Sequence, residues 1–151
     1  MAIVIEPLAA CDAEAAYAVE RESFSVPWSL DALVRELTEN KIAVYLAAVR
    51  REDKARELIG YCGMWHIVNE GHITNIAVLP RYRRMGVGTM LLSRLLDIAS
   101  ERRMLGLTLE VRMGNRSAMG LYHKFGFKAE GIRKNYYEDT GEDAVIMWKY
   151  L

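Results

Sequence analysis

Hydrophobic and polar residues follow two different periods along this chain, which predict strands alternating with helices. Residues 107–112 give the clearest strand, because Leu107, Leu109 and Val111 alternate with polar positions, as in a strand with one buried face. Over residues 87–103 the apolar positions recur every three or four residues, which predicts an amphipathic helix.

The same periods assign elements to the rest of the chain. The expected strands are residues 3–6, 42–49, 58–67, 72–79, 107–112, 127–137 and 143–150, and the expected helices are 12–24, 29–37, 87–103 and 117–125. Turns are expected at 50–57, 69–71 and 140–141. Asp12 and Ser29 suit helix N-caps and Gly126 suits a helix end. The resulting order, β-α-α-β-β-β-α-β-α-β-β, predicts an α/β (α+β) fold.

A basic, glycine-containing turn separates the strand at 72–79 from the helix at 87–103. Gly86 and Gly88 let the backbone approach a ligand closely. The first N–H groups of the following helix lack internal partners and suit a phosphate. Arg81, Arg83 and Arg84 add guanidinium groups. The segment predicts a phosphate or pyrophosphate site, with an ordinary turn on a solvated basic edge as the alternative.

Two common phosphate-binding glycine loops do not match this turn. A P-loop needs Gly-Lys-Ser/Thr, but Thr89 and Met90 follow Gly88. A dinucleotide-binding loop needs a third glycine where this chain has Leu91. The turn therefore belongs to another class of phosphate site.

Composition narrows the possible partners. The chain has 151 residues, 52% of them hydrophobic and 26% charged, with a formal net charge of zero, which predicts one domain over residues 1–151. A general nucleic-acid binder would carry a basic excess, so direct nucleic-acid binding is not expected. The sequence shows neither a signal-peptide pattern nor a stretch of about 20 apolar residues, so a cytoplasmic protein that does not enter membranes is expected. The oligomeric state stays open, and a monomer is compatible with the sequence.

Cysteine and histidine give little sign of metal or covalent chemistry. Cys11 and Cys62 are too few for a disulfide framework and are expected to be free thiols. His66, His72 and His123 lack metal-ligand spacing, so no metal site is expected.

The turn Arg83-Arg84-Met85-Gly86-Val87-Gly88 resembles the Arg/Gln-x-x-Gly-x-Gly/Ala loop of the GCN5-related N-acetyltransferase (GNAT) superfamily. In that superfamily the loop holds the pyrophosphate of acetyl-coenzyme A. The resemblance covers essentially the whole chain. It implies a single domain, with a mixed, mostly antiparallel central sheet flanked by helices, and acetyl-coenzyme A as co-substrate.

Acyl transfer to an amine requires a base and an acid, for which Glu110 and Tyr122 are the candidates. Glu110 faces away from the leucines of its strand, where it serves as a base or as an ion-pair partner of Arg112 or a neighbouring strand. Tyr122 on the next helix either protonates the leaving thiolate or belongs to the core. A carboxylate base suits an α-amine, with a pKa of about 7.7–8.0, better than lysine at about 10.4.

Further motifs are similar to those of the ribosomal-protein-alanine N-acetyltransferase (RimI) family. They are Leu109-Glu110-Val111-Arg112, Asn115-Arg116-Ser117-Ala118 and Leu121-Tyr122-His123-Lys124-Phe125-Gly126-Phe127. The resemblance implies that Glu110 is the proton acceptor and Tyr122 the proton donor. It also implies that the cofactor is held by Ile76, Ala77, Val78, Arg83, Arg84, Met85, Gly86, Val87, Gly88, Thr89 and Asn115. Asn115 also suits a helix cap, and Thr89 stands where the best-known bacterial members carry Arg.

Two segments resemble the loops that flank the acceptor groove in N-terminal acetyltransferases, Phe24-Ser-Val-Pro-Trp28 and Arg133-Lys-Asn-Tyr-Tyr137. Trp28 and Tyr136 either line a slot for the first acceptor residue or pack on the surface. His72 is a second candidate base, because a residue at its position assists proton removal in some relatives.

The resemblance implies direct acetyl transfer to a protein N-terminus, in particular the N-terminal alanine of a small-subunit ribosomal protein. Two alternatives stay open. One is an acetyltransferase for small amines or protein lysines, and the other is a non-catalytic acyl-coenzyme A sensor, which would need the phosphate cradle but neither Glu110 nor Tyr122.

Overall fold

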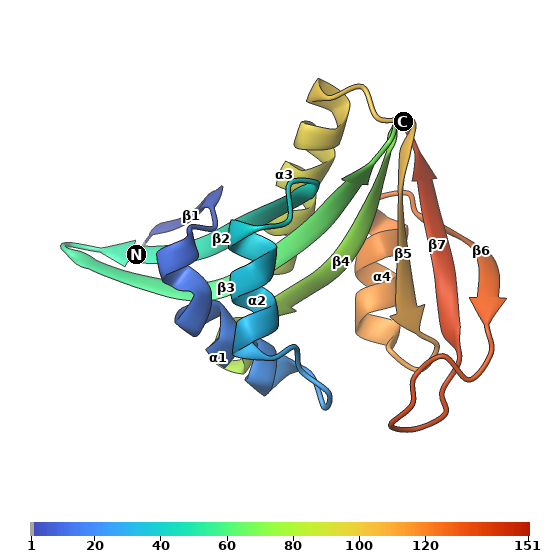
Figure 1. Cartoon of the computed structure of the whole chain (residues 1–151), viewed down its shortest axis with the longest axis horizontal. Helices are drawn as coiled ribbons and strands as arrows, with labels where there is room; N and C mark the ends of the chain where they lie inside the picture. Colours follow the sequence, from blue (N-terminus) through green and yellow to red (C-terminus); the bar gives the residue numbers. More distant parts are fainter. Residues whose placement is uncertain (1) are drawn as a thin grey trace.

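The computed structural model describes residues 2–151 and contains one seven-stranded sheet (Figure 1). Its strands lie in the order β1-β2-β3-β4-β5-β7-β6. They span Ala2–Pro7 (β1), Ala43–Glu52 (β2), Ala55–Ile67 (β3), Glu70–Val78 (β4), Gly106–Arg112 (β5), Lys128–Arg133 (β6) and Ala144–Tyr150 (β7). The β4–β5 pair is parallel and the other neighbouring pairs are antiparallel. The expected mixed, mostly antiparallel sheet is confirmed.

Helices cover both faces of this sheet. They are α1 (Ala13–Ser23), α2 (Leu30–Thr38), α3 (Val87–Glu101) and α4 (Arg116–Lys124), and short 3-10 turns precede α1 and α3. Neighbouring residues of β3 show the layering. The Tyr61 hydroxyl meets Glu20 of α1, whereas a Cβ on Gly60 would meet Val87 of α3. Helices α1 and α3 therefore lie on opposite faces (Figure 1).

The buried residues follow the predicted periods closely. Leu107, Leu109 and Val111 are buried in β5, and the alternating Thr108, Glu110 and Arg112 are partly exposed. On α3 the buried positions are Val87, Leu91, Leu92, Leu95 and Ala99. The core is therefore built from one face of each element, with the polar face of β5 left available.

Strands β4 and β5 separate soon after they meet. Their ladder joins only Glu70, Gly71 and His72 to Gly106, Leu107 and Thr108, after which the strands diverge (Figure 1). A register shift near Gly63 accompanies the divergence, because β4 has one more residue than β3 at that point. Within the described chain, β4 beyond His72 has a strand partner on its β3 side alone.

Several predicted boundaries are wrong. The expected loop at 50–57 is mostly strand, since β2 runs to Glu52 and β3 starts at Ala55. Arg50 of β2 pairs with Glu57 across the two strands and with Glu52 on its own strand. The turn expected at 69–71 falls earlier, because β4 already begins at Glu70. The strand expected to reach residue 137 ends at Arg133, and a loop of residues 134–143 follows.

The helix caps are confirmed in two cases and corrected in one. Ser29 accepts the N–H of Ala32 at 3.1 Å, and Gly126, at φ +91°, follows the end of α4. Asp12 precedes α1, but its carboxylate accepts the N–H of Ala9 and pairs with Arg56 instead of capping the helix. An opposite charge nearby thus outcompetes the helix N–H groups.

Candidate active site

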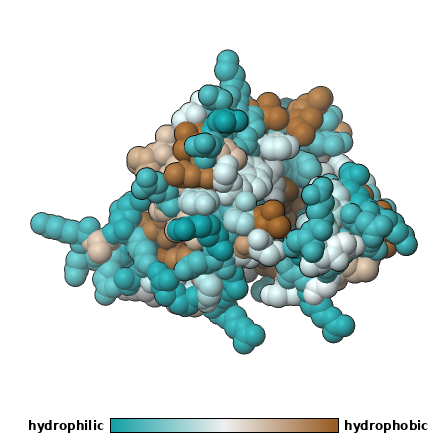
Figure 2. All heavy atoms as spheres, turned by 60° about the horizontal axis from the view of Figure 1, so that its bottom comes forward, coloured by the Kyte–Doolittle hydropathy of each residue, from teal (hydrophilic) through white to brown (hydrophobic). Residues whose placement is uncertain are grey.

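Two adjoining hollows occupy the region where β4 and β5 diverge. One, called the acceptor hollow after the role expected of its lining residues, has a volume of about 850 Å³ and is bounded by the α1–α2 loop, β5 and the β6–β7 loop. The other, the cofactor hollow, has about 530 Å³ and lies between β4, the turn before α3, and α4. Their shared lining residues are Ser23, Phe24, Ile76, Asn115 and Ala118. Figure 2 views the end of the molecule that carries both loops, where hydrophobic surface is set among polar side chains.

The backbone around Gly86 shapes the cofactor hollow. Gly86 caps α3 at φ +80° and Arg84 has φ +64°, so the chain turns sharply just before the helix. Among the described residues, no atom beyond Gly86 and its two chain neighbours lies within 4 Å of a Cβ built on Gly86, and one built on Gly88 would touch Leu121 at 3.4 Å. The N–H groups of the first turn of α3 therefore stand at an open, positively polarised position.

Most of the predicted cofactor residues line this hollow. They are Ile76, Ala77, Val78, Arg83, Arg84, Gly86, Val87, Gly88, Thr89 and Asn115. Met85 is exposed and is not among the residues lining the hollow. Arg81 instead donates to Glu57 at 2.7 Å. The unpaired edge of β4, the open helix N-terminus and two arginines together fit an elongated molecule with a diphosphate.

Asn115 is placed for both of its predicted roles. Its Oδ1 accepts the N–H of Ala118 at 3.1 Å, which confirms it as the N-cap of α4. It also lines both hollows. The same residue therefore fixes the start of α4 and borders the passage between the hollows.

The acceptor hollow brings together residues from distant parts of the chain. Glu110, Tyr122, Trp28 and Tyr136 all line it. His72 is not among the lining residues, but its Nε2 lies 2.7 Å from Oε2 of Glu110. The two candidate bases are thus a hydrogen-bonded pair, with Glu110 nearer the hollow.

The side chains of His72 and Arg133 both contact the Glu110 carboxylate. His72 meets Oε2, and the Nε of Arg133 donates to Oε1 at 3.2 Å. The Glu110 side chain is 14% exposed. The His72 hydrogen bond, opposed by burial and helped by the charge of Arg133, lowers the pKa of Glu110 below its ordinary value. Glu110 is therefore a carboxylate at neutral pH.

Tyr122 lies on α4 at the floor of the hollow. It is 8% exposed, and its ring centroid is 5.7 Å from that of Phe127. Burial raises the pKa of Tyr122 above its ordinary value, so its hydroxyl keeps its proton at neutral pH. Within residues 2–151 that hydroxyl has no hydrogen-bond partner, which leaves it available to a ligand.

The sequence prediction missed a buried carboxylate beside the hollow. Glu20 is 2% exposed and receives hydrogen bonds from Tyr61, Asn75 and the backbone N–H of Trp28. The hydrogen bond from the backbone of Trp28 attaches the α1–α2 loop to the Glu20 side chain of α1. Helical spacing was the available signal, because Glu20 follows Ala16 by one turn on the buried face of α1.

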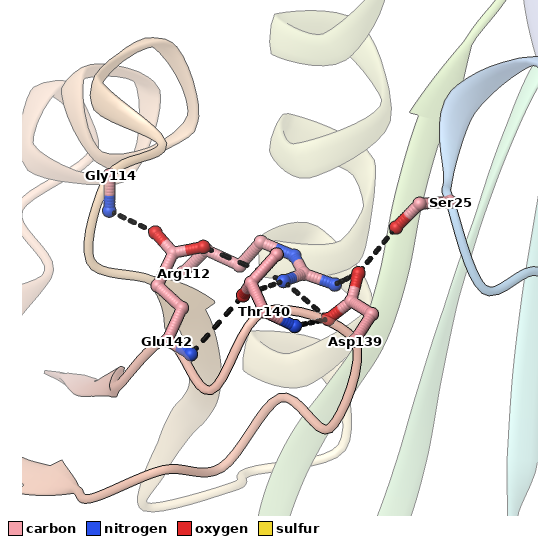
Figure 3. A network of polar contacts seen from close by, with 6 residues as sticks. All are labelled: Ser25, Arg112, Gly114, Asp139, Thr140 and Glu142. Carbon is pink, nitrogen blue, oxygen red and sulfur yellow. Dashed lines mark hydrogen bonds and ion pairs between the residues drawn. The ribbon is translucent and has the colours of Figure 1, made fainter.

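The other missed feature is a polar network across the rim of the hollow (Figure 3). Arg112 pairs with Asp139, and Asp139 accepts the hydroxyl of Ser25. Arg112 also approaches Thr140 and Glu142. No local pattern signals these contacts, because residues 25 and 139 belong to separate loops.

Two further properties concern membranes and metals. Among residues 2–151, no helix combines the length and apolarity needed to cross a membrane. In the same part of the chain, no three His, Cys, Asp or Glu residues group as they would around a metal ion.

Comparisons with known proteins agree with this geometry. Residues 13–127 match the profile of the Acetyltransferase (GNAT) family. A Bacillus subtilis protein is 44% identical over 91% of this chain and 88% of its own length. The [ribosomal protein bS18]-alanine N-acetyltransferase of Haemophilus influenzae is 36% identical over 98% of this chain and 99% of its own.

A solved structure also matches the fold. The crystal structure of the ribosomal-protein-S18-alanine N-acetyltransferase from Escherichia coli superposes with a TM-score of 0.87 at 32% identity, covering 99% of this chain and 94% of that one. The chain therefore belongs to the GNAT acetyltransferase family, within its ribosomal-protein-alanine N-acetyltransferase branch, and is an acetyl-coenzyme A-dependent N-acetyltransferase.

Proposed function

We propose that this enzyme acetylates the α-amine of a protein N-terminus, namely the N-terminal alanine of a small-subunit ribosomal protein. The observation that carries the proposal is that Glu110 and Tyr122 line one hollow, which joins the cofactor hollow at Ile76 and Asn115. The names of the Haemophilus and Escherichia relatives support the choice of acceptor. The proposed setting is the cytoplasm, with residues 1–151 acting as one domain.

The cofactor residues bind and orient acetyl-coenzyme A, which supplies the activated acetyl group. Arg83, Arg84 and the N–H groups at the start of α3 bind the diphosphate. The free edge of β4 at Ile76–Val78 binds the pantetheine arm as an added strand would bind. This arrangement directs the thioester toward the shared passage beside Asn115.

Glu110 removes the proton from the acceptor amine. Its lowered pKa makes it too weak to deprotonate a free ammonium, whose pKa is about 8. The acceptor therefore reacts as the neutral amine, after losing one proton to solvent. Its nitrogen becomes much more acidic as it bonds to the acetyl carbon, and the Glu110 carboxylate then accepts the second proton. His72, whose Nε2 lies 2.7 Å from Oε2 of Glu110, holds this carboxylate in place and is itself 31% exposed to solvent.

Tyr122 donates a proton to the departing sulfur. Its burial keeps the hydroxyl protonated, and its position on α4 places it beside the passage between the hollows. Cys11 is exposed and Cys62 is buried, and neither lines a hollow, which agrees with direct transfer without an acyl-cysteine.

A peptide panel tests this function. The purified protein is incubated with acetyl-coenzyme A and peptides that begin with alanine, matched peptides with a blocked N-terminus and an internal lysine, and small amines. Mass spectrometry then locates the acetyl group. Acetylation of the free alanine terminus is expected, and modification of lysine or small amines alone would refute the proposal.

A further inference from the structure

We propose that Ser25 and Asp139 form a clasp across the mouth of the acceptor hollow, that Arg112 positions this clasp, and that it selects chain ends as acceptors. The proposal rests on the proposed function for its assignment of the hollow to the acceptor. It adds specificity-determining residues that lie outside the catalytic pair.

The clasp joins two loops that are far apart in the sequence. The Ser25 hydroxyl, in the α1–α2 loop, donates to Oδ2 of Asp139, in the β6–β7 loop, at 2.6 Å (Figure 3). Both residues line the acceptor hollow, which lies between these loops. The hydrogen bond therefore closes a ring of protein around the entrance to the hollow.

Arg112 anchors the β6–β7 side of the ring. Its guanidinium makes two hydrogen bonds of 3.0 Å to Asp139, one to each carboxylate oxygen. The same group stacks over the Tyr137 ring at 4.0 Å and reaches Glu142 at 3.5 Å. A two-pronged contact of this kind fixes orientation as well as distance.

The carboxylate of Asp139 is fully engaged by its surroundings. Besides Arg112 and Ser25 it accepts the N–H of Thr140 at 3.0 Å. Hydrogen bonds from Ser25 and then Arg112 lower the pKa of Asp139, so the clasp is charged and intact at neutral pH. The β6–β7 loop is thus held to the end of β5, two residues beyond Glu110.

A closed entrance favours one class of amine. A chain end brings polypeptide to the entrance on one side of the amine only, whereas a mid-chain lysine brings it on both sides. Trp28 and Tyr136 lie on the two loops that the clasp joins, so their spacing is set before the acceptor arrives. Ordering the loops in advance removes an entropy cost from acceptor binding.

Ser25→Ala removes the clasp and leaves Arg112 and Asp139 paired. We expect the KM for an alanine-starting peptide to rise about 3- to 10-fold, since one hydrogen bond to a charged group and the prior ordering of two loops are lost. The preference for the chain end over an internal lysine, as a ratio of kcat/KM, should fall. The dissociation constant of acetyl-coenzyme A should stay within about twofold, because neither Ser25 nor Asp139 lines the cofactor hollow.

A double-mutant cycle separates the clasp from general damage. In the Asp139→Ala background, Ser25→Ala should have no further effect on acceptor KM, because the bond is already absent. Ser93→Ala, on the exposed side of α3, is the matched control and should leave every constant unchanged. Glu138→Gln removes a neighbouring charge from the hollow and should affect KM less than Asp139→Asn.

Amide hydrogen exchange supplies a readout that needs no turnover. Residues 24–28 and 135–142 should exchange faster in Ser25→Ala than in the wild type. Unchanged exchange and unchanged acceptor KM, additive effects in the cycle, or equal losses in Glu138→Gln and Asp139→Asn would each overturn the clasp. If the wild-type protein acetylates no peptide N-terminus, the proposed function is refuted instead. The amide exchange of Ser25→Ala would still show whether the hydrogen bond between Ser25 and Asp139 orders the two loops.

Discussion

At the scale of single residues, Glu110 shows how environment determines what a carboxylate can do. Alternation along β5 places it on the polar face, which the sequence alone predicts. Its contacts with His72 and Arg133 come from strands β4 and β6, and no local pattern specifies them. The sequence therefore indicated the residue, whereas its state of charge required the structure.

Glu110→Gln should lower kcat about 10²- to 10⁴-fold, the range typical of a lost general base, with little change in the affinity for acetyl-coenzyme A. Because the hydrogen bond from His72 holds the pKa of Glu110 below the ordinary value of a glutamate, the wild-type carboxyl stays ionised at the pH values where the rates are measured. The fall in kcat/KM on the acid side of the profile should then follow the acceptor α-amine, with its midpoint near pH 7.7–8.0. Steady-state rates between pH 5.5 and 9 check this, and a limb that tracks Glu110 would contradict it.

Two serines at the ends of the α1–α2 loop should respond oppositely to loss of their hydroxyls. The Ser23 hydroxyl is buried and, among the described residues, has no partner, whereas Ser29 caps α2. Ser23→Ala should leave the free energy of unfolding unchanged or raise it by about 1 kcal/mol, because a buried unsatisfied group is removed. Ser29→Ala should lower it by about 1 kcal/mol.

Urea denaturation of both serine variants provides the measurement. A loss of more than about 1 kcal/mol in Ser23→Ala would show that its hydroxyl makes a bond in the folded protein.

At the scale of elements, helices and strands were predictable where one face is buried, as in β5 and α3. The predictions fail where side chains far along the chain decide the outcome. Strand β6 ends at Arg133 because the following loop is held by Arg112 and by Asp143, which accepts the N–H of Asn135. These contacts stabilise an irregular loop conformation, which the local sequence propensity does not predict.

Two glycine substitutions, one at the start of α3 and one within α4, test how the backbone conformation at Gly86 contributes to stability. Gly86→Ala forces a side chain into φ +80° and should lower the free energy of unfolding by about 1–2 kcal/mol. It should also weaken acetyl-coenzyme A binding, because the turn before α3 shifts. Gly120 is exposed in α4, and apart from its chain neighbours and the backbone of its own helix no described atom lies within 4 Å of a Cβ built there, so Gly120→Ala should stabilise the fold by about 0.5–1 kcal/mol.

Thermal unfolding and calorimetric titration with acetyl-coenzyme A compare the two glycine variants. Equal stability changes of the same sign would show that the left-handed backbone at Gly86 is not what matters.

At the scale of the whole molecule, the order of elements could be predicted, but the divergence of β4 from β5 could not. The sequence specifies each strand, and the family resemblance supplied the mixed sheet. The short ladder and the bulge near Gly63 depend on packing across three strands. The charged residues at the turn between β2 and β3 could not be placed from the sequence either. The local pattern assigns them to a solvated loop, whereas in the structure they connect distant segments.

Arg56 is the centre of those connections and predicts how the molecule responds to acid. It donates to Glu6 of β1 at 2.8 Å and to the buried Asp12 at 2.9 Å. These bonds are the first cause of the lowered pKa of both carboxyls. A carboxyl with a lowered folded pKa stabilises the fold above its unfolded value, about 4, and this stability is lost as pH falls through the folded pKa.

Arg56→Gln should therefore lower the free energy of unfolding by about 1 kcal/mol at pH 7, a modest figure because the guanidinium is partly exposed. The difference from the wild type should be smaller at pH 3 than at pH 7, because the stabilisation by ionised Glu6 and Asp12 begins to be lost once the pH falls below their unfolded pKa values of about 4. Urea denaturation at the two pH values measures this. Arg94→Gln, which breaks an exposed pair on α3, is the control and should be neutral at both. A deficit in Arg56→Gln that persisted unchanged at pH 3 would mean that Arg56 acts through the packing of its aliphatic stem, because only its electrostatic contribution depends on the ionisation of Glu6 and Asp12.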